Sequence, residues 1–176
     1  MEKLLWVDLE MTGLDVEKER IIEVAAIITD KDYHELARYH AVVQQPKSLL
    51  DKMDDWNQEH HGKSGLLAKI PDGKKEKQVE TELLRWMAKH FDLNGPKTKR
   101  PILCGNSIYQ DKRFISKYWP RMNDALHYRV LDVSSFKVVF NGIHNVQYEK
   151  KNCHQAMEDI LESIGELKHY MEYVRF

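Results

Sequence analysis

The sequence predicts an α/β fold, with strands near its N-terminus and a long helix at its C-terminus. Residues 4–11, 21–29 and 34–43 are runs of strand length, and the first two are almost wholly apolar. From residue 156 almost to the C-terminus, apolar residues recur at helical spacing instead. Strands followed by amphipathic helices indicate a sheet that helices cover.

The first three strands are expected to form a meander. The first strand ends near Met11, and the turn Thr12-Gly13-Leu14-Asp15 follows it. Residues 21–29 indicate a second, buried strand, and residues 34–43 indicate a third. Because the connections between these runs are short, neighbouring strands are expected to pair in sequence order.

Helices and shorter strands are expected in the middle of the chain. Residues 48–70 indicate short helices, and residues 78–91 a longer amphipathic helix that Asn94-Gly95-Pro96 ends. We expect the next elements in this order: a short core strand over residues 101–105, a helix over residues 109–118 that Pro120 stops, and a strand over residues 126–131. Asp132 is well placed to cap the helix that follows.

Length and composition are those of one globular domain, residues 1–176, with 42% apolar residues. The net charge of −1 and the pI of about 6.8 disfavour a protein that grips long nucleic acid. Cys104 and Cys153 form no C-x-x-C pair, which indicates a reduced, cytoplasmic protein. No apolar run reaches membrane-spanning length, and Asp8 lies too close to Met1 for a signal or transit peptide.

Two carboxylates interrupt the first apolar run, at Asp8 and Glu10. Residues i and i+2 of a strand point to the same face, so both carboxylates project together. Two like charges on a buried face are costly unless cations compensate for them, and hard oxygen ligands favour Mg²⁺ or Mn²⁺. The alternative is that both acids lie at the exposed end of the strand and pair with arginines.

Three segments together resemble the three exonuclease motifs of the DEDDh family and, within it, those of the oligoribonucleases. They are Asp8-Leu9-Glu10-Met11-Thr12-Gly13-Leu14, Gly105-Asn106-Ser107-Ile108-Tyr109-Gln110-Asp111 and His154-Gln155-Ala156-Met157-Glu158-Asp159. The resemblance covers nearly the whole chain. It implies an RNase H-like exonuclease fold, with a mixed central sheet flanked by helices.

The resemblance also implies two-metal-ion hydrolysis of phosphodiesters. Asp8, Glu10, Asp111 and Asp159 would hold two Mg²⁺ or Mn²⁺ ions, and His154 would act as general base. On one continuous helix, His154 and Asp159 would diverge by about 140°. We therefore expect His154 on the loop that enters the C-terminal helix or in its first turn, and Asp159 inside the helix.

Substrate contacts follow from the same resemblance. Leu14 would wedge against the bases and His61 would stack on one of them, although His61 could also be a loop histidine. The 5′ phosphate end would be capped by Ser107, Arg129 and Ser134. The segment His127-Tyr128-Arg129 matches a place where a neighbouring subunit completes the site, so a homodimer is implied. Asp132 would cap a helix or orient Arg129.

One segment departs from the family pattern. Family members usually continue with a helix after the Ser134-Ser135-Phe136 position, whereas residues 138–145 look unlike that stretch. The predicted function is a 3′–5′ exoribonuclease that cuts fragments of about two to five residues to 5′-mononucleotides. The alternatives are an exonuclease for longer DNA or RNA 3′ ends and a catalytically inert nucleic-acid-binding module.

Overall fold

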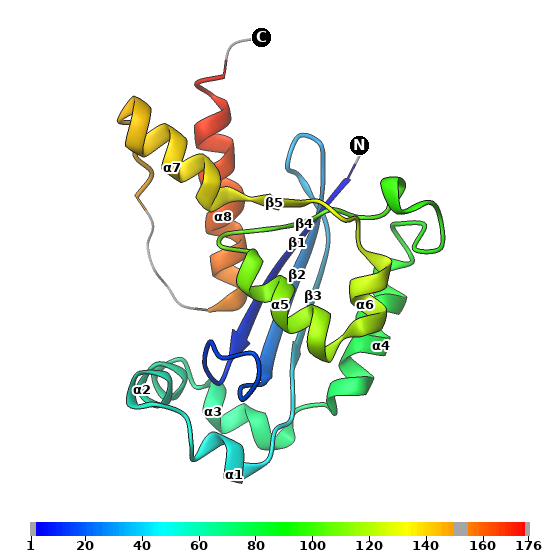
Figure 1. Cartoon of the computed structure of the whole chain (residues 1–176), viewed down its shortest axis with the longest axis vertical. Coiled ribbons are helices and arrows are strands. Elements are labelled where there is room, and N and C mark those ends of the chain that lie inside the picture. The colour runs from blue at the N-terminus through cyan, green and yellow to red at the C-terminus, as the bar shows by residue number, and fades with distance from the viewer. Residues whose placement is uncertain (1–2, 150–154, 175–176) are drawn as a thin grey trace.

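The computed structural model describes residues 3–149 and 155–174. Its mixed sheet has five strands in the order β3-β2-β1-β4-β5 (Figure 1). The first three strands pair antiparallel in sequence order, which confirms the predicted meander: β1 (Lys3–Met11), β2 (Ile21–Asp30) and β3 (Glu35–Val42). The other two strands run parallel to β1: β4 (Leu103–Gly105) and β5 (Val130–Asp132).

Helices lie on both faces of this sheet (Figure 1). Within the described ranges the α-helices are α1 (Lys47–Leu50), α2 (Asp55–Lys63), α3 (Leu66–Lys69), α4 (Glu76–Met87), α5 (Tyr109–Tyr118), α6 (Pro120–Ala125), α7 (Val133–His144) and α8 (Ala156–Met171). Short 3-10 turns, η1 (Ile70–Asp72) and η2 (Lys97–Lys99), complete the set. No helix among the described residues is long and apolar enough to cross a membrane.

The side chains of β1 alternate between two hydrophobic cores. Leu5, Val7 and Leu9 pack in one core with residues of α4, α5 and α6. Leu4 and Trp6 pack in the other core with residues of α8. Because both faces of β1 are covered, the sequence of this strand is a nearly continuous run of apolar residues. The even-numbered positions face α8, so the alternation directs Asp8 and Glu10 towards that helix.

Two sequence-based predictions need correction. The strand predicted over residues 126–131 is β5, which begins only at Val130, because α6 extends to Ala125 and Leu126 is its C-cap. Pro120 does follow the end of α5, as predicted, but it also begins α6 at a helix position where a missing N–H costs nothing. The amphipathic helix predicted over residues 78–91 is α4, which starts and ends earlier at Glu76 and Met87.

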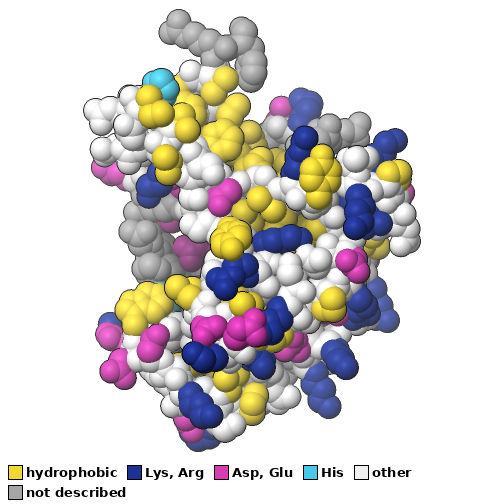
Figure 2. Space-filling view, viewed as in Figure 1, with side chains coloured by type: hydrophobic (Ala, Val, Ile, Leu, Met, Phe, Trp, Pro, Cys, Tyr) yellow, Lys and Arg dark blue, Asp and Glu magenta, His cyan; other side chains and the backbone are white. Residues whose placement is uncertain are grey.

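The segment that departs from the family pattern forms a helix throughout most of its length. α7 continues to His144, and Asp132 caps its N-terminus by accepting a hydrogen bond from the Ser134 N–H, as predicted. Only Val133 of α7 is buried, whereas Val138 and Ile143 are about 70% exposed. Hydrophobic side chains therefore gather at this end of the molecule, over α7 and α8 (Figure 2).

Candidate active site

Three carboxylates from two distant segments meet at the C-terminal end of β1. Asp8 and Glu10 lie on the face of β1 that α8 covers, and Asp159 lies in the first turn of α8. One oxygen from each of these side chains lies within 4.8 Å of the other two. Three hard oxygen ligands this close together fit a divalent cation such as Mg²⁺ or Mn²⁺.

Mutual repulsion and burial make this cluster electrostatically costly. Burial raises the pKa of Glu10 to about 8, and the charges of Glu23, Asp159 and Asp111 add to the effect. Burial likewise raises the pKa of Asp8 well above its usual range, with contributions from Asp111, Glu10 and Asp159. Near neutral pH, Asp8 and Glu10 therefore favour the protonated form, and a bound cation would instead compensate for their negative charge.

Asp111 supports the cluster from the side of β4. The strand β4 pairs with β1 only at Leu5 and Trp6, so among the described residues the backbone of β1 has no strand partner on that side farther along. Asp111, in the first turn of α5, fills the gap: its Oδ1 accepts a hydrogen bond from the Leu9 N–H at 2.9 Å. Burial raises the pKa of this carboxyl to about 7. Asp111 thus anchors the segment of β1 that carries Asp8 and Glu10.

His61 lies beside the cluster, on α2. Its ring is 2% exposed, its Nε2 lies 3.0 Å from the Met11 carbonyl oxygen, and its Nδ1 lies 4.0 Å from Glu10 Oε2. Burial lowers the pKa of this imidazole, which favours the neutral form. The general base predicted from the sequence, His154, lies outside the described residues.

Known proteins resemble this chain along nearly its whole length. The family model described as Exonuclease, of the RNase T family, matches residues 5–167. The oligoribonucleases of Bordetella pertussis and Haemophilus influenzae are 47% and 45% identical over 98% of this chain, and the alignments cover 95% and 94% of those proteins. The chain belongs to the oligoribonuclease family of exonucleases.

A solved structure extends the likeness to the fold. The zinc-bound form of Escherichia coli exonuclease I with single-stranded DNA matches 98% of this chain at a TM-score of 0.67 and 14% sequence identity. This chain spans 41% of that exonuclease I chain. The likeness confirms the predicted exonuclease fold, including the mixed sheet and the long C-terminal helix.

The serines that the oligoribonuclease resemblance singles out lie together around Asp132. Asp132 Oδ1 accepts hydrogen bonds from the Ser107 N–H at 2.9 Å, the Ser134 N–H at 3.0 Å and the Ser134 hydroxyl at 2.6 Å. Ser107 has a φ of 51°, in the left-handed region, and its bond to Asp132 helps to hold that backbone. Asp132 therefore acts as a helix cap that also joins the two serines.

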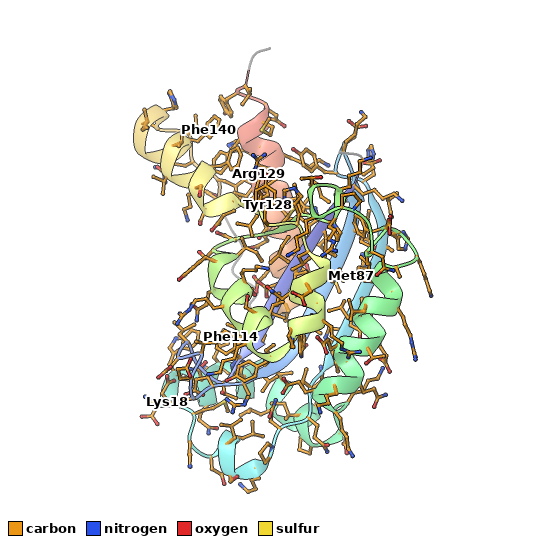
Figure 3. All side chains as sticks on the ribbon, turned by 45° about the vertical axis from the view of Figure 1, so that its right-hand side comes forward. Lys18, Met87, Phe114, Tyr128, Arg129 and Phe140 are labelled. Atoms are coloured by element: carbon orange, nitrogen blue, oxygen red, sulfur yellow. The ribbon has the colours of Figure 1, made fainter. Side chains whose placement is uncertain are left out.

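The remaining predicted contact residues lie in the turn after β1 and in the segment before β5; Leu14, Tyr128 and Arg129 are exposed, whereas His127 is buried. Leu14, in the turn after β1, is 71% exposed, and Gln110 donates a hydrogen bond to its carbonyl at 2.7 Å. Tyr128 is 62% exposed and stacks on His127, with the ring centroids 4.3 Å apart. The Arg129 guanidinium lies over the Tyr128 ring, 5.2 Å from its centroid, in the segment that leads to β5 (Figure 3).

One acid beside Glu10 in this oligoribonuclease site was not predicted from the sequence. Glu23 lies directly opposite Glu10 in the β1–β2 register, so both side chains share a face. His40 Nε2 lies 2.6 Å from a Glu23 oxygen. Glu23 is the only charged residue between Ile21 and Ile28 in the sequence. A single carboxylate within a buried strand is the pattern from which this residue could have been predicted as part of the site.

Proposed function

We propose that this chain is a metal-dependent 3′–5′ exoribonuclease that hydrolyses short RNA oligonucleotides to 5′-mononucleotides. The observation that carries the proposal is the meeting of Asp8, Glu10 and Asp159, with oxygens within 4.8 Å of one another, at the end of a strand. Relatives that share almost half of its residues over nearly the whole chain are oligoribonucleases.

The acidic residues would hold two Mg²⁺ or Mn²⁺ ions. Bound ions of this kind lower the pKa of a coordinated water and stabilise charge at the leaving oxygen. The strand β1 fixes the backbone of Asp8 and Glu10, α8 fixes that of Asp159, and Asp111 holds the backbone between the first two. His154 would accept the proton of the attacking water.

The predicted phosphate cap would select short substrates by geometry. Ser107 and Ser134, joined through Asp132, would bind the 5′ phosphate together with Arg129. The exposed Leu14 would wedge against the bases. His61 would reach a base only if α2 moves, because its ring is buried. A cap at the 5′ end restricts the site to oligonucleotides of about two to five residues.

We further propose that one domain, residues 1–176, acts as a homodimer in the cytoplasm. Val138 and Ile143 are exposed apolar side chains of α7, and Phe140 of the same helix lies at the same end of the molecule as Tyr128 (Figure 3). Apolar surface of this kind is typical of interfaces between subunits. His127, Tyr128 and Arg129 of one subunit would then complete the site of the other.

Hydrolysis of end-labelled oligonucleotides tests the proposal. An RNA dinucleotide, an RNA heptamer and a DNA dinucleotide are incubated with the protein and Mn²⁺. We expect the RNA dinucleotide to be cut fastest and the heptamer to lose residues from its 3′ end. Equal or faster cutting of the heptamer would instead support a general exonuclease, and binding without cutting would support an inert module.

A further inference from the structure

A second group of metal-binding side chains shares Glu10 with the acidic cluster. His60 and His61 follow one another on α2, and one ring nitrogen of each lies within 4.8 Å of the other and of a Glu10 oxygen. We propose that Glu10, His60 and His61 form a zinc site, separate from the all-carboxylate site and in competition with it for Glu10.

The hydrogen bond of His61 orients this imidazole as a metal ligand. The Met11 carbonyl can only accept, so His61 Nε2 carries the proton and donates it across 3.0 Å. The Nδ1 atom then keeps its lone pair, which lies 4.0 Å from Glu10 Oε2. A backbone carbonyl that fixes the second ring nitrogen is a common feature of metal-binding histidines.

The His60 ring is held by an aromatic neighbour on the same helix. Trp56 and His60 stack almost parallel, with ring centroids 4.6 Å apart and an interplanar angle of 8°. The His60 and His61 rings meet edge to face at 5.4 Å. Stacking fixes the plane of the His60 ring, and one nitrogen of this ring is the atom that lies within 4.8 Å of His61 and Glu10.

The chemistry of this ligand set favours zinc over magnesium. Two imidazole nitrogens and one carboxylate oxygen are ligands that Zn²⁺ prefers, whereas Mg²⁺ prefers oxygen alone. Three protein ligands would leave one tetrahedral position open. Tetrahedral zinc separates its ligand atoms by about 3.3 Å. The Glu10 backbone is fixed in β1, whereas its side chain, which is 18% exposed and has three rotatable bonds, can bring its oxygen closer to His61 Nδ1 than the present 4.0 Å.

Zinc at this site would withdraw Glu10 from Asp8 and Asp159. If the proposed function holds, Zn²⁺ therefore inhibits Mn²⁺-supported hydrolysis through His60. Zinc binding itself does not depend on the proposed function.

Zinc affinity of the full chain, measured by competition with a chromogenic chelator, tests the site. His60→Asn replaces the imidazole ring with a shorter amide, which cannot place a ligand nitrogen at the same position. His60→Phe removes both nitrogens but keeps a ring that can stack on Trp56. His34→Asn is the matched control, because His34 lies at the opposite end of the sheet, beside Asp30. Circular dichroism establishes that each variant is folded.

We expect both His60 variants to bind Zn²⁺ at least about tenfold more weakly than the wild type, and His34→Asn to match the wild type. Asp159→Asn should keep zinc affinity, because its side chain is not a ligand of the proposed site. Equal zinc affinity of the wild type and His60→Phe would overturn the proposal. So would an equally large loss in Asp159→Asn, which would place zinc in the acidic cluster.

Cobalt spectroscopy and kinetics provide independent readouts. Co²⁺ bound to the wild type should give the visible absorption of a tetrahedral nitrogen-ligated ion, and His60→Phe should lose it. Zinc should inhibit Mn²⁺-supported RNA hydrolysis by the wild type and not by His60→Phe. If the protein binds zinc through His60 but hydrolyses no RNA, the zinc site stands and the proposed function fails.

Discussion

Glu10→Gln is predicted to stabilise the metal-free protein while removing its activity. Burial among other carboxylates raises the Glu10 pKa from 4.5 to about 8. Between these two values the folded protein binds more protons than the unfolded chain, so the free energy of unfolding falls as pH rises. A neutral glutamine carries no such cost. The stabilisation by Glu10→Gln should therefore be small near pH 4.5, grow with pH and level off above about pH 8.

The size of the effect follows from the pKa difference. A pH of 7 is about 2.5 units above the pKa of the Glu10 carboxyl in the unfolded chain. This difference corresponds to at most about 3 kcal/mol in the free energy of unfolding. Because the neighbouring carboxylates titrate as well and the Glu10 side chain reaches solvent, we expect about 1–3 kcal/mol. For a protein of this size, about 2 kcal/mol raises Tm by roughly 4–8 °C.

Thermal unfolding in the presence of a chelator, from pH 5 to pH 8, measures this prediction. Glu17→Gln is the matched control, because the exposed Glu17 makes only a surface ion pair with Lys117, and Tm should change little. Mn²⁺ should then raise the Tm of the wild type more than that of Glu10→Gln. A Tm of Glu10→Gln at or below that of the wild type at pH 8, without metal, would refute the reasoning.

Substitutions at three further positions test the site and the proposed dimer. Asp111→Ala leaves the buried Leu9 N–H without its acceptor and should lower the free energy of unfolding by about 1–3 kcal/mol in denaturant titrations. Asp111→Asn keeps an acceptor oxygen and should lower this free energy less. If Asp111→Asn is as unstable as the alanine variant, the hydrogen bond is not the cause. Asp132→Ala removes the N-terminal cap of α7 and should lower the free energy of unfolding by about 1 kcal/mol. The same variant should have a higher KM for an RNA dinucleotide, and an unchanged KM would argue against the proposed binding of the 5′ phosphate by the two serines. Ile143→Asp should convert the proposed dimer to monomers in analytical ultracentrifugation, and a wild type that is already monomeric would exclude the dimer.

The sequence predicted the parts of the fold that local patterns encode. The strands β1, β2 and β3 were predictable because their apolar runs have strand length. The acids Asp8 and Glu10 were predictable as site residues because they interrupt such a run at positions i and i+2. α6 was missed because a helix of six residues between Pro120 and Ala125 has little periodicity.

Contacts between distant segments were beyond reach of local patterns. The hydrogen bond from Leu9 to Asp111 exists because β4 is too short to pair with the end of β1. The burial of His61 depends on how α2 docks beside Met11. The pairing of Glu23 with Glu10 follows from the strand register, which the sequence leaves open within a residue or two.

Hydrolysis of an RNA dinucleotide by the wild type, Asp159→Asn and Glu158→Gln tests the central claim most directly. Glu158 is the exposed acid next to Asp159 and serves as its matched control. We predict that chelation stops hydrolysis, that Mn²⁺ restores it in the wild type and in Glu158→Gln, and that Asp159→Asn is slower by at least about 100-fold. Wild-type rates in Asp159→Asn, or hydrolysis that persists without metal, would contradict the account.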